Sequence, residues 1–177
     1  MGKLKKQWAE YTELASRTMG RELGRDAQIR MCILGLMGEL GEILKEYRKY
    51  DYENMIMEFG DFFWYLSQCS LAADIDLVGE TDYSSIRFQS FVSPEVTLSA
   101  MVCESAGLID VLKKHLYHLD DFDENRVAKS LSILFADAIR FTGNVLVCDP
   151  YNIWMGNIAK LKHRWPGKFG EKSEGTN

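Results

Sequence analysis

Proline is scarce in this chain, and each proline stands where a helix would begin or end. The three are Pro94, Pro150 and Pro166 in a chain of 177 residues. Ser93 and Asp149 precede the first two, and a serine or aspartate cap followed by proline at the first helical position is typical of a helix start. Trp165 precedes the third, which predicts a helix end because the residue before proline avoids the helical region.

The spacing of apolar residues between these marks predicts an all-α helical bundle of about six helices. In the first helix, Leu4, Trp8 and Tyr11 fall on one face. Asp26 and Asp51 are expected to cap the second and third helices. The expected helices cover residues 3–19, 26–50, 51–74, 94–118, 124–143 and 150–163. We expect a packed loop at residues 75–93, and the alternative is that this stretch holds a short extended segment.

Length and composition fit one folded domain, which we place at residues 1–169, followed by a flexible tail at 170–177. The chain is 46% hydrophobic and 27% charged, with a net charge of −5. This acidic balance argues against partners such as nucleic acid or an anionic membrane, because both would be repelled. The longest apolar run, residues 31–38, is far shorter than the roughly 20 residues that a membrane span needs.

The four cysteines have no C-x-x-C spacing. This favours reduced, buried thiols over a disulfide framework or a zinc site. The first residues are basic but lack the apolar run of a signal peptide. We therefore expect a cytoplasmic protein.

Four acids stand in two otherwise apolar helical stretches. Glu39 and Glu42 are the only charged residues within 31–44, and Glu58 and Asp61 are the only ones within 55–71. Residues three apart share a helix face, with Cβ atoms about 5–6 Å apart. The short connection between the two helices predicts an antiparallel hairpin, which would bring the two acid pairs face to face.

Four ionised carboxylates in one place repel each other and are costly to desolvate. A hard divalent cation removes that cost, and oxygen-only ligands suit Mg²⁺, or Mn²⁺ as a substitute. No histidine follows an acid by three positions, which argues against a di-iron bundle. Gly41 and Gly60 each precede the second acid of a pair and predict the close approach of something bulky. The alternative is that the acids form the solvated faces of two amphipathic helices.

A weak internal repeat adds a second, degenerate copy of the hairpin. Residues 31–49 align with 96–114, and residues 55–66 align with 131–142. In this alignment Glu39, Glu42, Glu58 and Asp61 fall on Glu104, Gly107, Leu134 and Asp137. Two of the four acids are missing, so no second full metal site is expected. The alignment fits either a duplication or the general likeness of amphipathic helices.

The acid pairs resemble the motif of the MazG-like nucleoside triphosphate pyrophosphohydrolases. E-x-x-E at 39–42 is followed by E-x-x-D at 58–61, within the segments GLMGELGE (35–42) and EFGDFFWYL (58–66). The segment NIAKLKHRWP (157–166) resembles the N-x-x-K-L-x-x-R-aromatic-P ending of that family. The resemblance spans most of the chain, up to Phe169.

The resemblance implies an all-α enzyme that cleaves nucleoside triphosphates to monophosphate and pyrophosphate. It implies that Glu39, Glu42, Glu58 and Asp61 bind Mg²⁺ and carry the catalysis. A water activated by the ion and by a nearby carboxylate would attack the α-phosphorus, and which acid acts as the base stays open. The second copy would be scaffold or pocket wall, as in the family's double-length dUTPase-like relatives.

Five further residues are candidates for substrate binding. Lys45 either reaches a phosphate or pairs with Glu42 within the helix. Asn157, Lys160 and Arg164 share one helical face, where the cations suit phosphate and the amide suits a base or sugar. The alternative is a solvated basic end of the helix. Trp8 either stacks on a base or packs in the core.

We expect a homo-oligomer, either a dimer or a tetramer, because one helical hairpin leaves much apolar surface. Two other functions stay open. The chain could be a helical module that binds a nucleotide or a metal without turnover, or an enzyme with the same chemistry on an alarmone or a deoxyuridine nucleotide.

Overall fold

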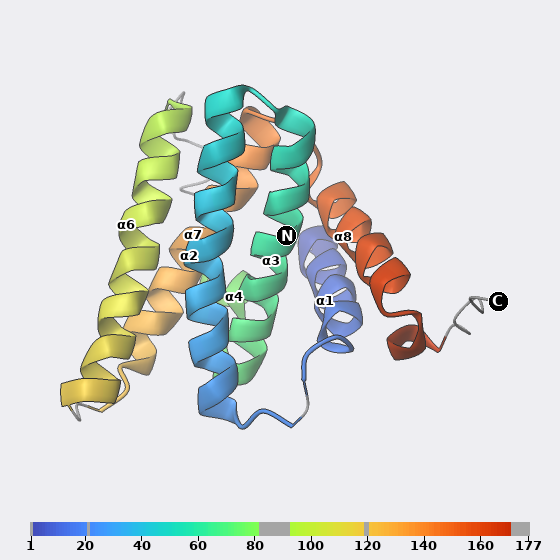
Figure 1. Cartoon of the computed structure of the whole chain (residues 1–177). Coiled ribbons are helices and arrows are strands. Elements are labelled where there is room, and N and C mark those ends of the chain that lie inside the picture. Colours follow the sequence, from blue (N-terminus) through green and yellow to red (C-terminus); the bar gives the residue numbers. More distant parts are fainter. Residues whose placement is uncertain (1, 21, 82–92, 119–120, 171–177) are drawn as a thin grey trace.

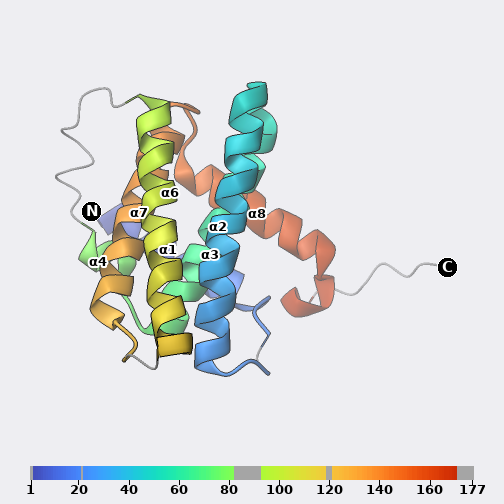
Figure 2. The same cartoon turned by 60° about the vertical axis from the view of Figure 1, so that its left-hand side comes forward.

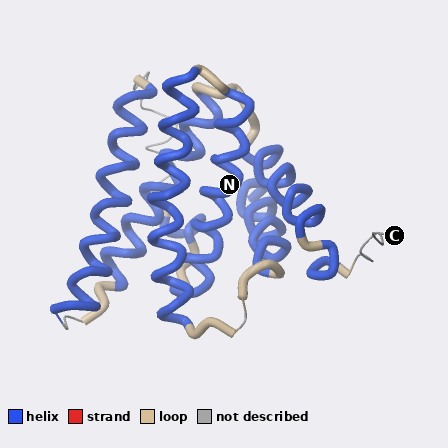
Figure 3. Tube along the Cα trace, viewed as in Figure 1, coloured by secondary structure: helices blue, strands red, loops and turns tan. Residues whose placement is uncertain are grey.

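The computed structural model describes residues 2–20, 22–81, 93–118 and 121–170, and these residues form helices and turns without a strand (Figures 1 and 3). In chain order the elements are α1 (Gly2–Ser16), α2 (Arg25–Lys49), α3 (Tyr52–Ala73), α4 (Leu77–Glu80), α6 (Pro94–Lys113), the π-helical turn η1 (Lys114–His118), α7 (Glu124–Asn144), α8 (Pro150–Arg164) and the 3-10 turn η2 (Pro166–Phe169). The all-α fold class is confirmed, and each of the six expected helices is present.

Three of the predicted helix caps are confirmed. Asp51 caps α3, Ser93 caps α6 and Asp149 caps α8, each by accepting a hydrogen bond from a backbone N–H of the first turn. The prediction that Asp26 caps α2 is wrong. Gly24 is the N-cap and makes no side-chain hydrogen bond, which leaves Asp26 in the first turn, where a carboxylate favours the positive end of the helix dipole.

The segment predicted as a packed loop at 75–93 contains a short helix, α4. Asp76 caps it by accepting a hydrogen bond from the N–H of Gly79 at 3.0 Å. Leu77 and Val78 are buried, so apolar burial explains why this segment packs as a helical turn. Residues 82–92 and the tail residues 171–177 lie outside the described residues.

Two antiparallel hairpins lie side by side and make up most of the bundle (Figures 1 and 2). The first consists of α2 and α3, joined at Tyr50 and Asp51, and the second consists of α6 and α7. α2 packs on α6 and α3 packs on α7. The two aligned halves of the chain therefore both form helical hairpins, and the duplication itself stays an interpretation.

An aromatic cluster joins α1 and α8 to the two hairpins. Its members are Trp8, Tyr11, Phe63, Phe135 and Trp154. Their ring centroids lie between 4.7 and 6.3 Å apart where they touch, which is the range of favourable aromatic pairs, about 4.5–7 Å. This packing fixes α8 against α3, so residues from the C-terminal part of the chain lie over the first hairpin.

The cysteines are free, and two of the four are buried as predicted, namely Cys32 and Cys69. The prediction is wrong for Cys103, which is exposed on the outer side of α6, and for Cys148, which is partly exposed in the turn before α8. Across the described helices, none combines the length and the apolar composition that a membrane-crossing segment requires.

Candidate functional site

Three of the four acids meet in the seam between α2 and α3. One carboxylate oxygen from each of Glu39, Glu58 and Asp61 lies within 4.8 Å of the other two. Glu39 stands in the middle of α2, whereas Glu58 and Asp61 lie one turn apart on α3, so the antiparallel hairpin brings the three together. All three side chains are partly buried. We call these three residues the acid cluster.

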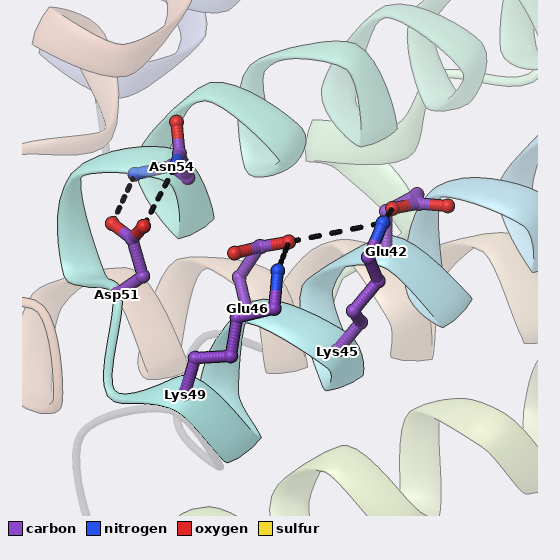
Figure 4. Close-up of polar contacts among 6 residues, drawn as sticks. All are labelled: Glu42, Lys45, Glu46, Lys49, Asp51 and Asn54. Carbon is purple, nitrogen blue, oxygen red and sulfur yellow. Dashed lines mark hydrogen bonds and ion pairs between the residues drawn. The ribbon is translucent and has the colours of Figure 1, made fainter.

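The fourth acid, Glu42, lies outside the acid cluster. Its carboxylate accepts a hydrogen bond from Lys45 Nζ at 2.6 Å, and its side chain is 49% exposed. This bond lowers the pKa of Glu42. Figure 4 shows both residues of this pair. Lys45 thus pairs with Glu42 within the helix, which was one of the two alternatives for Lys45. The structure therefore brings together three of the four predicted metal ligands and leaves the fourth beside them on the surface.

Two members of the acid cluster, Glu39 and Glu58, have raised pKa values. Burial and, after it, the negative charges of Asp61 and Glu58 together raise the pKa of Glu39 to about 7. Burial and the charge of Asp61 also raise the pKa of Glu58. Both effects penalise the ionised form. A bound cation would remove this penalty, whereas the solvated faces of an ordinary amphipathic helix would not produce it.

Helix α8 holds Asp61 through two side chains, one on each carboxylate oxygen. Asn157 Nδ2 donates to Asp61 Oδ1 at 2.8 Å, and Lys160 Nζ donates a short hydrogen bond to Asp61 Oδ2. Asn157 is 4% exposed, and its Oδ1 accepts a hydrogen bond from the Tyr11 hydroxyl at 3.1 Å. In this geometry both polar atoms of Asn157 are engaged, by Tyr11 and by Asp61, so Asn157 serves to orient Asp61. Its contact with a base or sugar stays a prediction.

Gly60 explains how α8 comes so close to α3. A Cβ atom added at Gly60 would lie 3.2 Å from Cβ of Asn157, which is tighter than ordinary van der Waals contact. The predicted close approach is thus found at this glycine, and the approaching group is the Asn157 side chain. At Gly41 no neighbouring described atom lies within 4 Å of an added Cβ, so the close approach stays a prediction there.

The remaining two candidates lie apart from the acid cluster. Arg164 is exposed at the end of α8, and its guanidinium lies 4.7 Å from the centroid of the Trp165 ring. Trp8 is 6% exposed in the aromatic cluster of the core. Trp8 thus packs in the core, as the alternative has it, where its ring contacts Tyr11, Phe63, Phe135 and Trp154. Its stacking on a base stays a prediction.

Sequence reasoning missed Glu46, a buried acid one turn beyond Glu42 on α2. Its Oε1 accepts a hydrogen bond from Lys49 Nζ at 2.7 Å and lies 4.0 Å from Lys45 Nζ (Figure 4). Its Oε2 is buried and has no partner among the described residues. Helical spacing could have identified Glu46, because Glu39, Glu42 and Glu46 share one helical face. Glu46 lies outside the apolar stretch in which Glu39 and Glu42 are the only charged residues, and was therefore overlooked.

Comparison with models of protein families, with curated proteins and with solved structures finds no match to this chain. An interpretation of the site therefore depends on its own residues and on the motifs of the sequence.

The donor set of the acid cluster fits a hard divalent cation. It consists of carboxylate oxygens alone, which suit Mg²⁺ or Mn²⁺. Mg²⁺ keeps several waters and takes few protein ligands, so three carboxylates suffice. Lys160 and Lys45 stand at the rim with half-exposed side chains, where they can meet the phosphates of a ligand. The arrangement thus suits a metal together with an anionic ligand.

Proposed function

We propose that this chain is a MazG-like pyrophosphohydrolase that cleaves nucleoside triphosphates to monophosphate and pyrophosphate with Mg²⁺ or Mn²⁺. The observation that carries the proposal is the acid cluster, in which oxygens of Glu39, Glu58 and Asp61 lie within 4.8 Å of one another. The raised pKa of Glu39 supports a site built for a cation. The spacing of the acid pairs and the ending at 157–166 support the reaction class.

In this proposal the acid cluster would hold the ion, and Glu42 would join it by turning away from Lys45. A bound ion would supply charge neutralisation at the phosphates and an acidified water for attack on the α-phosphorus. Lys45 and Lys160 then bind phosphate oxygens, since each sits at the rim on a flexible stem. Asn157 and Tyr11 keep Asp61 oriented through the hydrogen bonds described above.

Arg164 extends the same basic face of α8 by one further turn beyond Lys160. Its exposed guanidinium is available to the outer part of a nucleotide, and its contact with Trp165 restricts where it points. We therefore place Arg164 at the periphery of the substrate.

The proposal also includes a cytoplasmic location, small nucleotides as the substrates and a homo-oligomer, a dimer or a tetramer. Support for the oligomer comes from large apolar side chains of the first hairpin that lie exposed, such as Leu34, Met57 and Leu71. The net charge of −5 supports a small anionic substrate over a polyanionic partner.

The test is a panel of ribo- and deoxyribonucleoside triphosphates incubated with the protein and Mg²⁺, with chromatography of the products. We expect monophosphate and pyrophosphate in equal amounts, and no orthophosphate. The panel is extended to deoxyuridine nucleotides and an alarmone, which covers the same chemistry on other substrates. If no compound is turned over, the chain is a non-catalytic binding module and the proposal is wrong.

A further inference from the structure

Both oxygens of Asp61 are engaged from α8, but the two contacts differ in kind. Asn157 is buried and is itself held by Tyr11, so its hydrogen bond to Oδ1 is fixed by packing. Lys160 reaches Oδ2 from the surface, with a side chain that is 43% exposed. The hydrogen bond from Asn157 is therefore fixed by the packing of the site. The contact from Lys160 is made by a flexible side chain that can move away from Asp61.

Lys160 is also the one side chain, within the part of the chain that the structure describes, that forms an ion pair with a member of the acid cluster. Its positive charge favours the ionised forms of Glu39 and Glu58 as well. One ammonium group therefore serves as the cation for three carboxylates. By contrast, Lys49 is paired with Glu46, which lies outside the cluster.

A divalent cation bound by Asp61 would take the oxygen that Lys160 now contacts and would repel its ammonium group. We propose that Lys160 is a built-in competitor for the metal, which holds Asp61 until the ion binds and is then released. The inference rests on the proposed function, because it requires a cation in the acid cluster.

The contacts explain how this exchange can occur without a change of fold. Asn157 keeps its hydrogen bond to Oδ1 when Lys160 leaves, so Asp61 does not need to reorient. The released ammonium group stays tethered to α8 at the rim of the cluster. It is then free for a phosphate oxygen, so metal binding and binding of an anionic substrate reinforce each other.

The test measures Mn²⁺ affinity of the whole protein by calorimetry after chelation and dialysis, without any nucleotide. The variants are Lys160→Met and, as the matched control, Lys49→Met. Both remove one positive charge from a lysine paired with an acid of the first hairpin, and a general charge effect would shift both alike. We expect Lys160→Met to bind Mn²⁺ roughly tenfold more tightly than the wild type and Lys49→Met to change by less than about twofold.

A second measurement uses the wild-type protein, so it does not depend on the folding of a variant. In protein labelled with ¹³C at the lysine ε-carbons, the signal of Lys160 should move towards that of a free lysine as Mg²⁺ is added. A Lys160 signal that stays unchanged at saturating Mg²⁺ would overturn the proposal, and so would equal affinities of the two variants. Nucleotide hydrolysis by the wild type would stand in either case.

The same measurements also distinguish a failure of the proposed hydrolysis from a failure of the proposed competition. If Lys160→Met binds Mn²⁺ more tightly and Lys160 is released by Mg²⁺, but the nucleotide panel shows no turnover, the competition is supported and hydrolysis is wrong. If the wild type and Glu58→Gln both show no Mn²⁺ binding, no metal site exists and both proposals are wrong.

Discussion

The two hairpins of this bundle carry acids at aligned positions and neutralise them in different ways. In the second hairpin, Glu104 accepts hydrogen bonds from Ser130 at 2.9 Å and Arg126 at 3.3 Å. Asp137 accepts one from Arg140 at 2.6 Å, and the two side chains of that pair are only 10% and 11% exposed. Each of these two acids therefore has an arginine of its own.

In the first hairpin the acid cluster shares a single lysine, Lys160, that arrives from another helix. Arginine is permanently charged and its planar group matches a carboxylate, whereas lysine is a flexible point charge. The aligned acids of the second hairpin are thus neutralised by arginines of that hairpin, and the first keeps an excess of negative charge. This difference supports the proposal of a cation site in the first hairpin, with the second hairpin as its scaffold.

Packing also closes the second hairpin to a metal. Gly107 stands where the alignment places Glu42, and a Cβ atom there would lie 3.0 Å from Nη2 of Arg126. Leu134 stands in place of Glu58 and is fully buried. The positions that align with Glu42 and Glu58 therefore lie against a guanidinium group and in the apolar core.

The largest effect is expected on turnover, and it separates the two hairpins directly. Glu58→Gln should lower nucleotide hydrolysis by at least about 100-fold, because the cluster loses a charged ligand at the reacting group. Glu104→Gln, the matched change in the second hairpin, should leave hydrolysis within about twofold. Steady-state rates of both variants against the wild type measure this.

Removing one of several crowded charges should not harm the fold, so Glu58→Gln is expected to unfold at the same temperature as the wild type or higher in the absence of metal. Equal rates for Glu58→Gln and Glu104→Gln would remove the functional distinction between the hairpins.

The next largest effect is on the free energy of unfolding. Here the larger loss is expected for a change in the second hairpin. Arg140→Met leaves Asp137 buried without its cation, which should lower the free energy of unfolding by about 3 kcal/mol. Lys160→Met removes the half-exposed lysine of α8 that pairs with the first hairpin, and it should change the free energy of unfolding by less than about 1 kcal/mol. Urea unfolding of both variants measures the two values.

The double variant Arg140→Met with Asp137→Asn serves as the control, because it removes both charges together. It should recover part of the loss. If Lys160→Met proves as destabilising as Arg140→Met, then Lys160 is a structural cation like the arginines, and the contrast between the hairpins fails.

The pH dependence of stability gives a third and smaller test. The folded pKa of Glu39 is about 7 against an ordinary value of 4.5, so between these values the folded chain binds more protons than the unfolded chain. Stability from this group is therefore complete below about pH 4.5 and is lost as the pH rises through 7. Because the carboxyl is half-exposed, we expect the wild type to lose only about 1 kcal/mol relative to Glu39→Gln between pH 5 and 7.5.

The measurement is denaturant unfolding across this pH range in the presence of a chelator. Added Mg²⁺ should restore the lost stability of the wild type and not that of Glu39→Gln. If the free energies of unfolding of the two proteins change with pH in parallel, burial and the neighbouring charges do not raise the pKa of Glu39.

The fold and most of the acid cluster could be predicted because residues close together in the sequence determine them. Helical periodicity and the three prolines place the helices, and the short connection at Tyr50 and Asp51 forces α2 and α3 to be antiparallel. These two facts bring Glu39, Glu58 and Asp61 together without any knowledge of the remaining chain.

The parts that could not be predicted depend on choices between close partners or on distant packing. Glu42 could point to the cluster or to Lys45 three residues away, and a side-chain rotamer decides between them. The role of Asn157 depends on where α8 lies, which the aromatic core determines. Trp8 looks the same in sequence whether it covers a base or fills that core.

Glycine supplies the smallest test, and it begins from another difference between the hairpins. Gly41 and Gly60 of the first hairpin align with Ala106 and Ala136 of the second. Glycine inside a helix costs up to about 1 kcal/mol against alanine. Gly41→Ala should therefore raise the free energy of unfolding by about 0.5–1 kcal/mol, since an added Cβ meets open space.

Gly60→Ala should not show that gain, because its new Cβ would lie 3.2 Å from Cβ of Asn157. Asn157 would have to shift by a few tenths of an ångström, and its hydrogen bond to Asp61 would shift with it. We expect a net change in stability near zero, about 0.5 kcal/mol in either direction, and Mn²⁺ binding weaker by about twofold or more, with unchanged Mn²⁺ affinity in Gly41→Ala. If calorimetry and urea unfolding find the two variants alike, α8 does not position Asp61. The first hairpin would then differ from the second in its charges alone and not in how its acids are held.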